Sequence, residues 1–101
     1  MYDKIVKEFS SRPRDVHTVP MVAREPKWFH VFVEKGTVYV ESAHSNQPKC
    51  SVKKRSLQKK ECNTMLELYH KRRAGRNVSK EAQEATYSQV YWYGIFAELK
   101  L

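Results

Sequence analysis

The segment from residue 27 to residue 42 constrains the fold most, because two runs rich in aromatic and β-branched residues flank a single glycine. The runs read KWFHVFV and TVYVES, a pattern that predicts two strands of an antiparallel hairpin. Lysine fits a two-residue primed turn poorly, so residues 34–36 are expected to form a type I turn with Gly36 in a bulge. Alternation along the first strand places Trp28, His30 and Phe32 on one face and Phe29, Val31 and Val33 on the other.

An amphipathic helix is expected before the hairpin. Its apolar residues recur three and four positions apart, and Pro13 excludes helix immediately before it. β-Branched residues follow at 16–22, where Pro20 permits only an edge strand or an extended loop. The apolar face of the helix consists of Tyr2, Ile5, Val6 and Phe9.

Three helices are predicted after a connection at residues 43–56. Ser56 is expected to cap the first helix, which ends with basic residues before Gly75, because glycine commonly closes a helix in the left-handed conformation. A very short second helix starts after Ser79. The third helix, at 89–99, is apolar on nearly every side and is expected to pack against several neighbours.

The expected fold class is α+β, with an N-terminal helix and a small antiparallel β-sheet (hairpin 27–42) followed by a C-terminal three-helix subdomain. A chain of 101 residues can bury one core, so a single domain is expected, with a helix-and-hairpin part at 1–48 and a basic helical part at 49–101. No apolar run reaches the roughly 18 residues of a membrane span, and two cysteines are too few for a disulfide scaffold. A cytoplasmic protein without membrane contact is therefore expected.

Positive charge is concentrated in one segment of the chain. The formal net charge is +8, yet residues 1–48 carry seven basic and six acidic side chains. Residues 49–80 carry eleven basic side chains and only two acidic ones. Such a basic segment attracts polyanions, most often nucleic acid, although a solubilising surface without a partner is the alternative.

The last third of the chain has the pattern of a helix-turn-helix. The helix that ends before Gly75 is followed by the small residue Ala82 and by a turn at 86–88. Apolar residues then occur at the usual spacing, at Tyr87, Trp92 and Ile95. This pattern resembles the helix-turn-helix of resolvases and invertases and of homeodomain-like modules. The resemblance implies that the last helix faces a DNA groove with Ser88, Gln89, Val90, Tyr93 and Gly94.

Two features depart from that pattern. Thr86 stands where glycine is usual, and the last helix has no lysine or arginine among residues 89–99. Gln89 is the best candidate for a base contact, because glutamine can pair with adenine. The whole chain also resembles the small proteins found in bacterial genomes and mobile elements.

No catalytic site, metal site or cofactor is expected. A tetrahedral zinc site would have to combine Cys50, Cys62 and His70 with His44 or His30, and these residues lack the paired spacing of zinc ligands. No nucleophile elbow or phosphate-binding glycine loop occurs, so the protein is not expected to be an enzyme. The aromatic residues of the hairpin and of 91–93 are expected mainly in the core, although an exposed aromatic sheet face could serve RNA.

These observations predict a small accessory protein that binds nucleic acid, with DNA ahead of RNA. The alternative is a protein-interaction or inhibitor module that docks its basic face on an acidic protein. The phosphate contacts would come from Lys53, Lys54, Arg55, Lys59 and Lys60 ahead of the first basic helix, and from Lys71, Arg72, Arg73 and Arg76 at its end, with Gln89 on a base.

Overall fold

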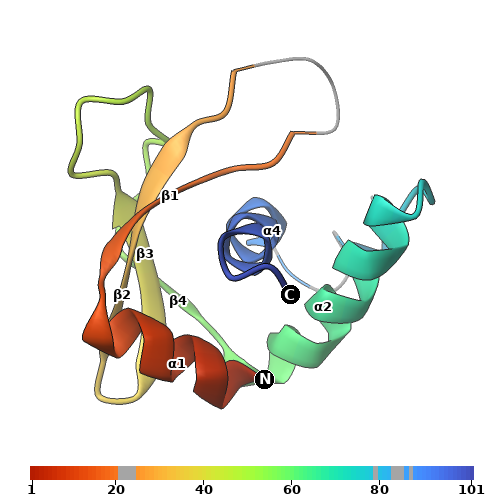
Figure 1. The fold of residues 1–101 in the computed structure, drawn as a ribbon, viewed down its shortest axis with the longest axis horizontal. Coiled ribbons are helices and arrows are strands. Elements are labelled where there is room, and N and C mark those ends of the chain that lie inside the picture. Colours follow the sequence, from red (N-terminus) through yellow and green to blue (C-terminus); the bar gives the residue numbers. More distant parts are fainter. Residues whose placement is uncertain (21–24, 79, 83–85, 87) are drawn as a thin grey trace.

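The computed structural model describes residues 1–20, 25–78, 80–82, 86 and 88–101, which fold into a mixed α+β structure (Figure 1). Its strands form one antiparallel sheet in the order β1-β2-β3-β4. In chain order the elements are α1 (Tyr2–Ser11), β1 (Arg14–His17), β2 (Trp28–Glu34), β3 (Thr37–Ser42), β4 (Arg55–Leu57), α2 (Lys59–Arg73) and α4 (Gln89–Glu98).

The predicted N-terminal helix and hairpin are confirmed by α1 and by β2 and β3. An edge strand or an extended loop was expected at 16–22, and the edge strand β1 overlaps only the start of that segment, ending at His17, whereas residues 21–22 lie outside the described residues. The predicted C-terminal three-helix subdomain is matched in part, by α2, by α4 and by helical residues at 80–82. Ser79, which was expected to begin the short second helix, lies outside the described residues.

The turn between β2 and β3 differs from the prediction. Glu34 pairs with Thr37, so the turn has two residues, and both Lys35 (φ 50°) and Gly36 (φ 76°) are left-handed. This is the geometry of a type I′ turn, and the predicted type I turn with a bulge is wrong. The twist of a type I′ turn matches that of the two strands, and this match outweighs the poor fit of lysine.

A fourth strand, β4, lies at the end of the segment that was predicted to be a connection. It pairs with β3, placing Ser56 opposite Tyr39, so Ser56 belongs to a strand and does not cap a helix. Gln58 is instead the N-cap of α2. Three residues are too few to show strand periodicity. The segment is extended because it forms hydrogen bonds with the edge of β3 that β2 leaves free.

The end of α2 follows the prediction. Gly75 has a φ of 90°, and its amide donates to the Arg72 carbonyl at 3.0 Å. The next amide, of Arg76, donates to the Lys71 carbonyl at 3.1 Å, which completes a Schellman motif. The chain therefore turns sharply away from the helix axis immediately after its basic last turn.

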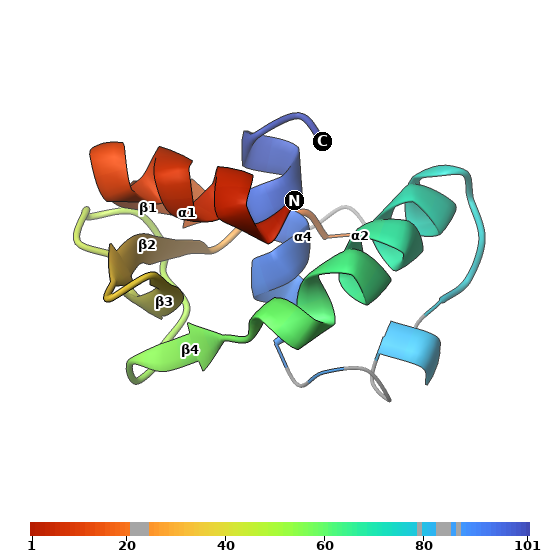
Figure 2. The same ribbon diagram turned by 90° about the horizontal axis from the view of Figure 1, so that it is seen from below.

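Helix α4 occupies the centre of the core, between the sheet and α2 (Figure 2). Trp92, Ile95 and Phe96 are fully buried, as expected from its uniformly apolar sequence. The helix approaches the sheet so closely that a Cβ atom at Gly94 would lie 2.7 Å from the His17 carbonyl oxygen. Glycine is therefore the residue that this contact permits.

Helix α1 is fixed to the sheet by a buried tyrosine. The Tyr2 hydroxyl donates to the Leu57 carbonyl at 2.6 Å and accepts from the Val38 amide at 2.9 Å. Burial raises the pKa of Tyr2, although the hydrogen bond from the Val38 amide acts in the opposite direction. In the described part of the chain the helices cover one face of the sheet, and none of them lies on the other face.

Candidate nucleic-acid interface

The basic residues predicted to bind phosphate form two separate groups. Lys59 and Lys60 begin α2, whereas Lys71, Arg72 and Arg73 end it. At 1.5 Å per residue, the first and last residues of this helix are about 21 Å apart along its axis. The basic segment of the sequence is therefore not one continuous patch.

The residues of β4 and its approach are divided between the two faces of the sheet. Arg55 shares the core-side parity of Leu57, and its Nη1 lies 3.4 Å from the Ser88 hydroxyl at the start of α4. Lys54 has the opposite parity, so it lies on the side of Tyr39 and Ser56. Lys53 is exposed.

The arginines at the end of α2 make tertiary contacts. Arg72 lies over the Tyr93 ring at 4.6 Å and donates to the Val19 carbonyl at 2.7 Å. Arg73 lies over the Tyr69 ring at 5.6 Å, and Lys71 pairs with Glu67 at 3.2 Å. Arg72 thus joins α2 to α4 and to the segment after β1, whereas these contacts of Arg73 and Lys71 lie within α2.

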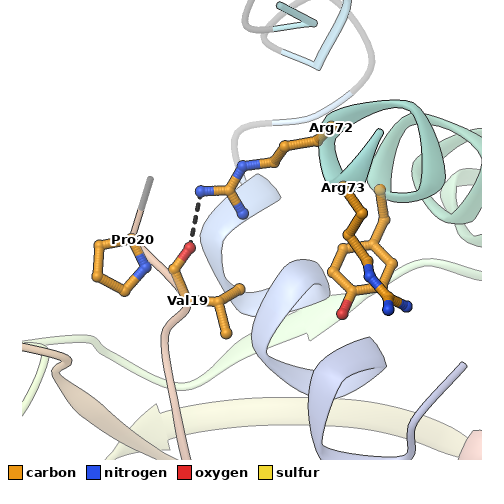
Figure 3. A pocket seen from close by; sticks show the side chains of 5 residues that line it. Val19, Pro20, Arg72 and Arg73 are labelled. Atoms are coloured by element: carbon orange, nitrogen blue, oxygen red, sulfur yellow. Dashed lines mark hydrogen bonds between the residues drawn. The ribbon is translucent and has the colours of Figure 1, made fainter. Parts of the chain in front are cut away.

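A shallow pocket of about 280 Å³ lies between these two arginines and the segment after β1 (Figure 3). Val19 and Pro20 line it across from the arginines, and Tyr69 also contributes to its lining. Arg76, beyond the helix, is exposed. Arg72 and Arg73 already interact with other groups of the protein, so they stabilise the fold whether or not they also bind phosphate.

Helix α4 offers little surface to a nucleic-acid groove. Of the residues expected to face the groove, Ser88, Tyr93 and Gly94 are buried. Gln89 is half-buried, and Val90 is 46% exposed. A base contact by Gln89 stays a prediction, but it would come from the first turn of the helix alone.

A stronger candidate surface is the face of the sheet opposite the helices, here called the open face. It carries Trp28, His30 and Phe32 of β2, Tyr39 and Glu41 of β3, and Lys54. The aromatic residues on it are half-buried, whereas their neighbours in β2, such as Phe29 and Val31, are fully buried beneath them. The alternation predicted for β2 is thus confirmed. In Figure 1 α2 and α4 lie on one side of the sheet, so the open face is the other side.

The rings on the open face contact one another. Phe32 and Tyr39 are cross-strand partners whose rings are nearly parallel, with centroids 5.7 Å apart and an interplanar angle of 20°. Trp28 meets His17 of β1 edge to face at 5.0 Å. Aromatic surface therefore extends over three adjacent strands.

A lysine ammonium lies above these rings. Lys54 Nζ is 4.6 Å from the centre of the Tyr39 ring and 5.8 Å from that of Phe32. It also pairs with Glu34 Oε2 at 2.6 Å, and this hydrogen bond raises the pKa of Lys54. Its side chain is 47% exposed, so the ammonium is charged and accessible to a ligand in solvent.

Beside the rings, a polar cluster joins three strands and the segment after β3. His30 Nδ1 lies 2.9 Å from Asp15 Oδ1, and His44 Nε2 lies 2.6 Å from Glu41 Oε2. Asp15 also accepts the backbone amides of His44 and Ser45, at 3.1 and 2.8 Å. Burial alone would raise the pKa of Asp15, but the hydrogen bonds from these amides and from His30 outweigh it and lower that pKa to about 2.

This cluster is not apparent from short spacings between histidines and cysteines in the sequence. His30 and Glu41 are brought together by the cross-strand register of the hairpin. The predicted three-residue turn at 34–36 would have placed His30 opposite Val40, and the observed two-residue turn shifts the register by one residue, so that Glu41 lies opposite His30. Of the zinc ligands weighed from the sequence, His30 and His44 meet, and their rings are stacked with centroids 3.6 Å apart. Cys50 and Cys62 are free thiols on other parts of the fold.

No protein-family model, curated protein or solved structure matches the chain. Within the described part of the chain, none of the helices combines the length and hydrophobicity that crossing a membrane requires.

Proposed function

We propose that this protein binds single-stranded nucleic acid on the open face of its sheet. The observation that carries the proposal is the half-buried row of Trp28, Phe32 and Tyr39 with the Lys54 ammonium above it. Aromatic rings on a sheet give unpaired bases a surface for stacking, and a nearby cation meets the phosphate.

The contact of Lys54 with the rings suggests how a base would bind. A base stacked on Tyr39 takes the place of the ammonium, which moves on its flexible stem to the adjacent phosphate. This exchange keeps the lysine charge paired, because a phosphate oxygen replaces Glu34, and the Glu34 carboxylate, which is 50% exposed, is then hydrated by water. Lys49, whose backbone bridges to Trp28, and Lys53, next to Lys54 in the chain, are both exposed and are the nearest candidates in sequence for further phosphate contacts.

Acidic residues on or beside this face do not oppose the proposal. Glu34 is paired with Lys54, Glu41 with His44, and Asp15 with His30 and two backbone amides. Their charges are therefore compensated in the free protein, and of the three only the exposed Glu34 loses its partner when Lys54 moves to a phosphate. The net charge of +8 still attracts a polyanion from a distance.

The same geometry favours single strands over duplex DNA. The faces of duplex bases are stacked on each other, so the rings of the open face would have nothing to bind. Duplex readout would need a helix in the major groove, and α4 is buried from Trp92 to Phe96. The basic residues at the two ends of α2 would then serve as secondary phosphate contacts.

Binding of a fluorescent uridine or thymidine oligonucleotide, measured by anisotropy, tests the proposal. Tyr39→Leu removes the ring but keeps apolar cover on the sheet, and we expect it to weaken binding about 5- to 150-fold, the effect of about 1–3 kcal/mol per stacked base. Lys54→Ala should reduce the slope of log affinity against log salt by about 0.7, one phosphate contact on a single strand. Lys100→Ala, an exposed lysine after α4, is the matched control and should leave the affinity nearly unchanged.

Circular dichroism checks that Tyr39→Leu is folded. A folded Tyr39→Leu protein with wild-type affinity would overturn the proposal. So would tighter binding to a duplex of the same length, or a preference for an acidic protein over both oligonucleotides.

A further inference from the structure

Three side chains with metal-ligating atoms converge at one end of the open face. His30 comes from β2, Glu41 from the opposite position of β3, and His44 from the segment after β3. Their ligand atoms all lie within 4.8 Å of one another. A tetrahedral zinc ion with bonds of about 2.0–2.1 Å holds its ligand atoms about 3.3 Å apart, so the three side chains are near enough to share an ion once the His44 ring is reoriented.

His30 is held as metal-binding histidines usually are. Its Nδ1 lies 2.9 Å from the carboxylate of Asp15, which fixes the ring with Nδ1 as the donor and leaves the Nε2 lone pair available. Asp15 is itself held by the amides of His44 and Ser45. The His30 side chain is 13% exposed, so its orientation is set by the fold before any ion arrives.

His44 supplies the movable ligand. Its ring is stacked on that of His30 with an interplanar angle of 10°. An ion lies in the plane of each imidazole that binds it, so two parallel rings cannot bind the same ion. The His44 side chain is 59% exposed and can rotate out of the stack. This rotation also breaks the 2.6 Å contact between His44 Nε2 and Glu41 Oε2.

We propose that His30, Glu41 and His44 bind a zinc ion, with Asp15 positioning His30 and water completing the coordination. Two imidazoles and one carboxylate suit zinc, whereas magnesium and calcium prefer all-oxygen sites. The ion adds two positive charges beside the aromatic rings, next to the carboxylates of Glu41 and Asp15. This inference does not depend on nucleic-acid binding, because the protein alone contains the whole ligand set.

Isothermal titration of tag-free, chelator-treated protein with zinc chloride tests the site. We expect saturable binding of one ion per chain at micromolar concentrations. His44→Ala should weaken binding at least about tenfold, and because this side chain is exposed the variant should fold. His70→Ala removes an exposed histidine from α2 and is the matched control, which should bind like the wild type.

Cobalt substitution gives a second readout that identifies the ligands. A tetrahedral spectrum without a thiolate charge-transfer band is expected, together with shifted His30 and His44 ring resonances in the zinc-loaded protein. Absence of saturable binding would overturn the proposal, and so would equal losses in His44→Ala and His70→Ala. A thiolate band would also overturn it, because the ion would then be held by Cys50 or Cys62.

Discussion

Replacing Gly94 by alanine tests the packing of α4 against the sheet. The added Cβ would lie 2.7 Å from the His17 carbonyl oxygen and 2.9 Å from the Phe29 ring. Both separations are below van der Waals contact, and the first involves backbone that cannot rotate away. Such overpacking costs about 1–3 kcal/mol, and the backbone contact places this substitution at the upper end of that range.

Helix propensity acts in the opposite direction. Alanine is favoured over glycine within a helix by about 1 kcal/mol. The expected net loss in the free energy of unfolding is therefore about 2 kcal/mol, which for a chain of this size lowers Tm by about 8 °C or more. Thermal and urea unfolding followed by circular dichroism would measure it.

The control is Ala97→Gly, which reverses the substitution one turn later in the same helix. Ala97 is half-buried, so this change should cost about 1 kcal/mol, mainly through propensity. If Gly94→Ala stabilised the protein by about the propensity difference, the close approach of α4 to β1 and β2 would be refuted.

Three further predictions concern the core, the turn and the pH dependence of folding. Trp92→Ala removes a fully buried ring whose indole NH lies 3.2 Å from Glu61. The substitution should lower the free energy of unfolding by about 3–5 kcal/mol in denaturant titrations, and a variant as stable as wild type would contradict the core assignment. Lys35→Asn should stabilise the protein by about 1 kcal/mol, because asparagine adopts the left-handed conformation more readily, and a lower Tm would argue against the type I′ turn. The folded pKa of Asp15, about 2, lies below its ordinary value of 3.8, so about 2 kcal/mol of stability is present above roughly pH 4 and is lost as the pH falls toward 2. Asp15→Asn should remove this part of the pH dependence, and an unchanged acid-unfolding profile would contradict it.

Periodicity predicted the elements that bury an apolar face. The spacing of Ile5 and Phe9 predicted α1, and the alternation from Trp28 to Val33 predicted which side chains of β2 enter the core. Gly75 marked the end of α2, because a left-handed residue is needed there. These features are local, so the sequence of each segment is sufficient to predict them.

Features that depend on distant partners were not predictable in the same way. Strand β4 exists because β3 offers it hydrogen bonds, and nothing in the residues Arg55–Leu57 requires an extended conformation. The cluster around His30 depends on the hairpin register and on β1. The division of the basic residues follows from strand parity and from the length of α2, neither of which appears in a count of charges.

The central position of α4 also determines when the protein can fold during synthesis. Phe29 in β2 packs against Tyr91 and approaches Gly94, and Tyr2 at the other end of the chain lies beside Trp92. Until residues 89–98 have left the ribosome, the inner face of the sheet and the apolar side of α2 have no common partner. The nascent chain therefore exposes its most hydrophobic surface until α4 emerges, and chaperones that bind such surfaces have access to residues 1–88 throughout that interval.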